Sequence, residues 1–144
     1  MMRTLLFVYM LSGMLFAMNA QQAAKALGVE NRYDQAIQKA KRDKKIVVMV
    51  VVKEHCRWCE KLVNTTLKDP RVQKHLQDFV TVVVDKDAPY PSDFRENFFP
   101  SVFYIDYSTE KSIYENVGYI GAKHFLNDLE SVKKTYEGLY SSGK

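Results

Sequence analysis

The 144-residue sequence contains two cysteines, Cys56 and Cys59, and their spacing fits one helical turn. A thiolate attacks a disulfide sulfur, and a second thiol within reach can then resolve the mixed disulfide. The pair therefore predicts thiol–disulfide exchange, in which Cys56 attacks and Cys59 resolves. Other interpretations of the pair are a structural disulfide, two unrelated buried thiols, or a Cu(I) site made of two thiolates.

The cysteine count and the composition exclude several other classes of protein. A disulfide-stapled mini-protein and a four-thiolate zinc site both need more cysteines. Hydrophobic residues make up 47% and charged residues 26%, which is typical of a globular domain. The net charge is +4, and the densest basic run lies at residues 39–45. Because no aromatic-rich RNA-binding motif accompanies this run, we interpret it as a solvated helix end and predict no nucleic-acid partner.

The elements around the cysteines are expected to place Cys56 at the start of a helix. Residues 46–52 form an unbroken apolar run that predicts a strand buried on both faces. Residues 59–67 have helical character and follow at once. Backbone N–H groups at a helix start stabilise an anion, so the pKa of a partly exposed Cys56 thiol should be lowered there. The positive charges of Arg57 and of a protonated His55 should stabilise the thiolate further.

The other elements predict a small α/β sandwich with a mixed sheet, because strands and helices alternate and are followed by a hairpin and a helix. Further helices are predicted at residues 33–42, 71–79, 93–97 and 122–136, and further strands at residues 79–84, 102–105 and 112–117. A hairpin turn at residues 107–111 would join the last two strands.

The first 20 residues have the composition of a secretory signal peptide. Arg3 provides a positive start, residues 5–16 are almost wholly apolar, and small or polar residues follow. The apolar run has about a dozen residues, whereas a membrane-spanning helix needs about 20. We predict cleavage after Ala20, with an uncleaved N-terminal anchor as the alternative. Export, expected to be to the bacterial periplasm, would place the cysteine pair in an oxidising compartment.

Three features together make the chain resemble the thioredoxin-fold superfamily. They are similar to three features of exported thioredoxin-like thiol–disulfide oxidoreductases: the strand–CxxC–helix unit, the cis-proline element, and the closing strand–glycine–helix junction. Together they extend over residues 30–136. The matching residues are Trp58-Cys59 at the end of the strand–CxxC–helix unit, Phe99-Pro100-Ser101 before a predicted strand, and Val117-Gly118-Tyr119 before the last helix.

The resemblance implies a three-layer α/β/α domain with a central mixed sheet at residues 31–140, after a short lead at residues 21–30. It implies a cis Phe99–Pro100 bond beside Cys56, where the backbone of Phe99 would pair with an extended substrate. Because the cysteine pair itself carries two electrons, no bound cofactor and no metal are expected. The implied partners are protein thiols or disulfides and a membrane-bound redox protein, and the chain is expected to be a monomer.

The sequence also departs from thioredoxin near the cysteines. Arg57 and Trp58 replace the Gly-Pro dipeptide, and Val50 aligns with the buried acid of the central strand. A proton relay to Cys59 is therefore missing or comes from elsewhere, with Glu54 either as the candidate or as a solvated loop carboxylate. Trp58 is interpreted as a platform for substrate or as a cover for the domain edge. The alternative function is a non-catalytic thioredoxin-fold module that binds Cu(I) or a partner protein.

Overall fold

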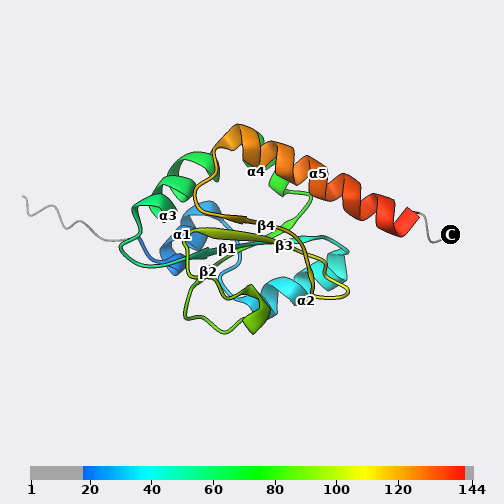
Figure 1. Ribbon diagram of the computed structural model, residues 1–144, viewed down its shortest axis with the longest axis horizontal. Coiled ribbons are helices and arrows are strands. Elements are labelled where there is room, and N and C mark those ends of the chain that lie inside the picture. The colour runs from blue at the N-terminus through cyan, green and yellow to red at the C-terminus, as the bar shows by residue number, and fades with distance from the viewer. Residues whose placement is uncertain (1–17, 142–144) are drawn as a thin grey trace, which may run out of the picture.

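A four-stranded mixed sheet forms the centre of the computed structural model, which describes residues 18–141 (Figure 1). The strands are β1 (Val47–Val52), β2 (Val80–Asp85), β3 (Ser101–Ile105) and β4 (Ser112–Val117). In the order β2-β1-β3-β4, β1 is parallel to β2 and antiparallel to β3, and β3 is antiparallel to β4. The predicted mixed sheet is therefore confirmed.

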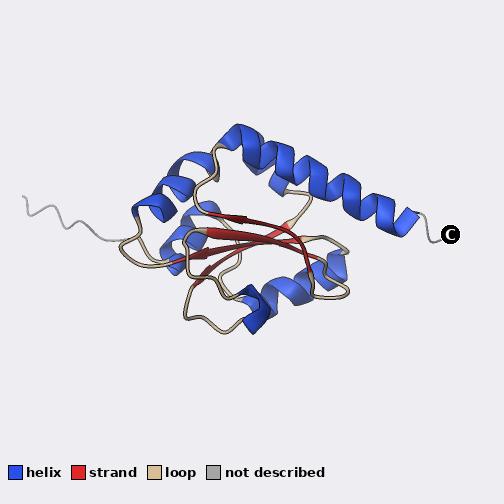
Figure 2. Ribbon diagram, viewed as in Figure 1, coloured by secondary structure: helices blue, strands red, loops and turns tan. Residues whose placement is uncertain are grey.

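Helices cover both faces of the sheet and complete the predicted three layers (Figure 2). One face packs against α2 and the 3-10 turn η2, and the other packs against the remaining helices. The helical elements are α1 (Ala20–Leu27), α2 (Tyr33–Asp43), α3 (Arg57–Lys61), the π-helical segment η1 (Leu62–Thr66), α4 (Pro70–Leu76), η2 (Ser92–Phe94) and α5 (Ala122–Ser141). Within the described residues, none of these helices combines the length and hydropathy that a membrane span requires.

The central strand β1 explains why its sequence is apolar without alternation. Its side chains point to opposite faces in turn, so Val48 and Val50 reach the core beneath α3 and α5, while Val47 and Met49 reach the core beneath α2. Because helices cover both faces, all six residues of β1 are buried. The cysteine motif therefore follows directly after a strand in the middle of the sheet.

The helix after the motif differs from the uninterrupted one predicted at residues 59–67. The α-helix begins at Arg57, and its second half continues as the π-helical segment η1, in which the Leu67 N–H donates to the Leu62 carbonyl at 2.9 Å. The Thr65 hydroxyl donates to the Lys61 carbonyl at 2.6 Å, at the point where the winding changes. Such π segments are frequent at functional sites.

Other element bounds differ less from the predictions, apart from one helix that the sequence analysis missed. The helix predicted at residues 93–97 is the short turn η2, and the last helix continues to Ser141. The interval expected to be a short lead, residues 21–30, contains all of α1 except its first residue, Ala20. The N-cap residue Asn19 forms a capping box with Gln22. The predicted cleavage after Ala20 falls inside α1, while residues 1–17 of the predicted signal peptide lie outside the described residues.

Candidate active site

Cys56 and Cys59 form a disulfide at the junction between β1 and α3, with their Cα atoms 5.2 Å apart. Cys56 is the N-cap residue of α3, and its Sγ atom accepts a hydrogen bond from the Cys59 N–H at 3.2 Å. The preceding residue, His55, has a positive φ of 54°, which turns the chain sharply from the strand into the helix. The sequence thus places both sulfurs at the start of a helix, as its spacing predicted.

Cys56 is more buried than the sequence analysis expected. Cys56 was predicted to be partly exposed, but its exposed fraction is 6%, and that of Cys59 is 1%. The difference arises because both side chains belong to the core beneath α5, and because Phe99 packs against that core. Cys56 nevertheless remains the more accessible sulfur of the pair, which agrees with the order of attack proposed for an exchange reaction.

The segment around Pro100 lies directly beside the disulfide. The Phe99–Pro100 peptide bond is cis, and the Sγ atom of Cys56 lies 3.8 Å from the Phe99 carbonyl oxygen. Pro100 is buried, and its carbonyl accepts a hydrogen bond from the Gly118 N–H at 2.7 Å. The neighbouring Phe98 is 69% exposed. Segments 56–59, 98–100 and 117–119, which are far apart in the sequence, therefore meet at one end of the sheet.

The surroundings of Cys59 contain no buried carboxylate among the described residues. Val50, at the position where thioredoxins carry an acid, is fully buried in the same apolar core as Cys59. Glu54 is exposed and lines a hollow together with Asn31 and Asp85. The proton relay assigned to Glu54 stays a prediction, and its exposure fits the alternative role of a solvated loop carboxylate.

Aromatic and basic side chains surround the disulfide on the α3 side. Trp58 is half-exposed, and its ring centroid lies 5.7 Å from that of Tyr119. The Lys61 ammonium lies 5.1 Å from the centroid of Trp58 and 4.7 Å from that of Tyr119. The guanidinium of Arg57 lies 5.8 Å from the centroid of Trp58. Trp58 therefore forms part of a basic and aromatic surface next to Cys56.

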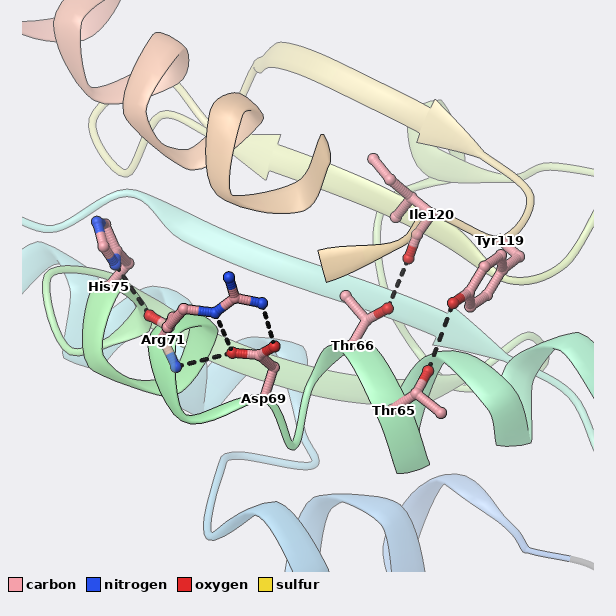
Figure 3. Close-up of polar contacts among 7 residues, drawn as sticks. All are labelled: Thr65, Thr66, Asp69, Arg71, His75, Tyr119 and Ile120. Carbon is pink, nitrogen blue, oxygen red and sulfur yellow. Dashed lines mark hydrogen bonds and ion pairs between the residues drawn. The ribbon is translucent and has the colours of Figure 1, made fainter. Parts of the chain in front are cut away.

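The loop that carries Tyr119 is tied to η1 by two neighbouring threonines (Figure 3). The buried Thr66 hydroxyl donates to the Ile120 carbonyl at 2.7 Å, and the exposed Thr65 hydroxyl lies 3.5 Å from the Tyr119 hydroxyl. Hydrogen bonding to these threonines, with the nearby positive charge of Lys61, lowers the pKa of Tyr119. Sequence reasoning noted Tyr119 in a junction motif but assigned no role to it, nor to Lys61 or the threonines.

A family model for a thioredoxin-like domain matches residues 33–133, which is well over half of the chain. The chain belongs to the thioredoxin-like domain family. The resemblance seen in the sequence is thereby confirmed, and so is the predicted fold class. A cysteine pair that forms a disulfide in this fold is consistent with the general class of thiol–disulfide oxidoreductases.

Solved structures show the same fold as this thioredoxin-like chain. A thioredoxin from Thermus thermophilus is 22% identical, with a TM-score of 0.64, over 72% of this chain and 85% of that one. The oxidised C-terminal domain of DsbD from Neisseria meningitidis is 17% identical, with a TM-score of 0.58, over 72% and 97%. An oxidoreductase named DsbH is 18% identical, with a TM-score of 0.57, over 73% and 83%. A comparison with curated proteins gave no significant match.

The thioredoxin-like domain offers few side chains that could hold a metal beside the cysteine pair. Among the described residues, no three histidine, cysteine or acidic side chains gather in a way that could bind an ion. His75 and His124 lie on α4 and α5 rather than at the motif, and His75 lies 3.6 Å from Glu130.

Proposed function

We propose that the chain is an exported thiol–disulfide oxidoreductase whose Cys56–Cys59 pair exchanges with the thiols and disulfides of other proteins. The observation that carries the proposal is the disulfide at the start of α3, with Cys56 as the N-cap residue and Cys59 one turn further on. A structural disulfide needs no such position, whereas a nucleophilic thiolate is stabilised by the free N–H groups found there.

In the reducing direction, the reduced pair transfers two electrons to a substrate disulfide. The Cys56 thiolate attacks one substrate sulfur, so a mixed disulfide forms and the other substrate sulfur leaves as a thiolate. The Cys59 thiolate then attacks the Cys56 sulfur, which breaks the mixed disulfide and releases the second substrate thiolate. The two protons given up by the cysteines balance the two that the substrate thiolates take up.

The oxidising direction is the same sequence of steps in reverse. A substrate thiolate attacks the Cys56–Cys59 disulfide, and the second substrate thiolate then displaces Cys56 from the mixed disulfide. A separate redox protein with its own dithiol or disulfide restores the starting state in either case. Arg57 flanks Cys56, and its positive charge would stabilise the Cys56 thiolate, as would that of His55 when it is protonated. This favours the reduced form and hence an oxidising role.

Two neighbouring features are assigned to substrate contact. The backbone of Phe99 lies against the Cys56 sulfur, where it would pair with an extended substrate segment. Pro100 offers no N–H of its own and is held in place through its carbonyl by Gly118. The exposed rings of Phe98 and Trp58 would pack against the substrate on either side of the reacting sulfurs.

Export is supported by the charged start and short apolar run of residues 1–20. We propose that the chain acts in the periplasm, where disulfide chemistry persists. Fractionation of cells that express the full-length chain, with N-terminal sequencing of the recovered protein, tests this. Recovery of the whole chain in the cytoplasm would contradict it.

A trapping experiment tests the exchange reaction and the two cysteine roles. A Cys59→Ser variant, isolated from cells after acid quenching, should accumulate mixed disulfides through Cys56, and mass spectrometry would identify the proteins attached. The matched Cys56→Ser variant should accumulate far fewer, because its remaining thiol is the more buried one. Reduced wild-type protein should also reduce insulin disulfides, and Cys56→Ser should not. If wild type and Cys56→Ser prove equally inert, the exchange function is wrong.

A further inference from the structure

Three basic side chains around the disulfide are held by aromatic rings. The Lys53 ammonium lies 5.7 Å from the Phe99 ring centroid, and Arg57 and Lys61 both lie within 6 Å of the Trp58 centroid. Cations at such distances are attracted to the faces of aromatic rings. We refer to Lys53, Arg57 and Lys61 as the ring-held cations.

The ring-held cations form no ion pair with a carboxylate of residues 18–139, although some other basic side chains do. Lys41 pairs with Glu110, and Lys133 pairs with Asp78. The same short segment also contains Glu54 and Glu60, so a carboxylate partner was available in the sequence. A ring fixes the place of a cation without neutralising its charge, so these charges remain open to a partner.

Among the ring-held cations, Lys61 has the most extensive set of neighbouring contacts. Lys61 lies over two rings at once, because Trp58 and Tyr119 pack together. The Tyr119 hydroxyl lies 3.5 Å from that of Thr65, and Thr66 anchors the backbone of the same loop. Because these groups already contact one another, we expect less entropy to be lost when a partner binds them.

We propose that the ring-held cations select substrates in which Asp or Glu residues flank the reacting cysteine. This inference rests on the proposed exchange function and names the substrate class of the same site. A carboxylate beside the substrate cysteine would contact Lys61 or Arg57 while the substrate sulfur approaches Cys56. The exposed Trp58 ring would pack against apolar atoms of the same substrate segment. Opposite charge also raises the rate of encounter, and added salt suppresses this effect.

The test compares peptides that share one disulfide and differ only in the residues that flank the cysteines. One peptide carries acidic residues there, the second carries Asn and Gln, and the third carries Lys. Pre-reduced full-length protein is mixed with each peptide, and the reaction is stopped by acid and thiol alkylation. Each rate is divided by the rate at which dithiothreitol reduces the same peptide, which removes differences in intrinsic disulfide reactivity.

Wild-type protein should prefer the acidic over the basic peptide by at least about tenfold at low salt, and the preference should shrink toward unity at high salt. Lys61→Gln should lower the preference about two- to fivefold. Lys74→Gln removes the same charge from exposed α4, away from the motif, and should leave the preference unchanged. The preference is a ratio, so a general change in the reactivity of Cys56 cancels.

The possible outcomes separate the two proposals. Equal normalised rates for all three peptides would overturn the charge selection and leave the exchange function intact. The same holds if Lys61→Gln and Lys74→Gln lower the preference equally, because the effect would then come from net charge. Failure of wild-type protein to react with any peptide would overturn the exchange function, and the selection with it.

Discussion

The surroundings of the disulfide and the seam between α4 and α5 both carry several basic side chains, but they hold them differently. At the disulfide, the ring-held cations rest on aromatic rings. At the α4–α5 seam, three basic side chains lie beside carboxylates. The seam pairs are Arg71 with Asp69 at 2.8 Å, Lys133 with Asp78 at 2.8 Å, and His75 with Glu130 at 3.6 Å.

This difference separates charges that serve the fold from charges that are open to a partner. Beneath the seam, Val72 of α4 and Leu129 and Val132 of α5 are buried in one core. The contacts of Lys133 with Asp78 and of His75 with Glu130 cross its exposed edge, whereas the Arg71–Asp69 pair lies at the start of α4. Figure 1 shows α3 at one end of the molecule and the last turns of α5 at the other. The same residue types are therefore exposed in both regions, but they pair with carboxylates in one and contact aromatic rings in the other.

The largest expected effect concerns the support of the loop next to the disulfide. Thr66→Val keeps the shape of a buried side chain but leaves the Ile120 carbonyl without its hydrogen bond, so the free energy of unfolding should fall by about 1–3 kcal/mol. The adjacent Thr65→Val is the matched control, because Thr65 is exposed, and its cost should be about 0.5 kcal/mol or less. Urea unfolding measures both. Equal costs would show that the anchoring of this region does not depend on the buried hydrogen bond.

Much of the fold could be predicted because the sequence carries strong local signals. The run at residues 46–52 is apolar on both faces, which indicated a central strand, and the motif that follows it indicated the strand-to-helix junction. Helix α1 was missed because its residues were assigned to the signal peptide and to a lead. Its signals were nonetheless present, since Asn19 and Gln22 form the capping box and Gly28 adopts the left-handed conformation that ends the helix.

The parts of the candidate site that lie close together in the sequence could be predicted. The parts that depend on contacts between residues far apart in the sequence could not. Cys56 and Cys59 could be found from spacing alone. The burial of Cys56 could not, because it depends on packing against residues some 40 positions away in the chain, such as Phe99. The pairing of Lys61 with Tyr119 joins α3 to the loop before α5, and no local pattern reports such a contact.

A pair of lysine substitutions tests the contrast between the two regions directly. Lys133→Gln removes the ion pair with Asp78 and should lower the free energy of unfolding by at most about 0.5–1 kcal/mol, since both groups are well exposed. It should leave the preference for acidic peptides unchanged. Lys61→Gln should do the opposite, with a changed preference and little change in unfolding. If both variants alter both quantities, charges in the two regions do not differ in role.

The smallest effect is a difference in acid sensitivity that originates in the seam. Hydrogen bonds and charge from Arg71 lower the pKa of Asp69 from 3.8 to about 2, and Lys133 lowers the pKa of Asp78. Because a lowered pKa in the folded state means that the unfolded chain binds protons more readily, the stabilisation is present above about pH 4 and is lost as the pH falls toward 2.

Asp69→Asn tests this acid sensitivity with little disturbance of the helix, since Asn also serves as an N-cap residue. Urea midpoints at neutral pH and near pH 3 should converge more closely for Asp69→Asn than for wild type, because the variant has lost one of the groups that titrate. Glu54→Gln is the control near the disulfide, since Glu54 forms no ion pair within residues 18–139, and it should retain the wild-type loss. An unchanged acid sensitivity in Asp69→Asn would mean that the Asp69–Arg71 pair contributes nothing measurable to the fold.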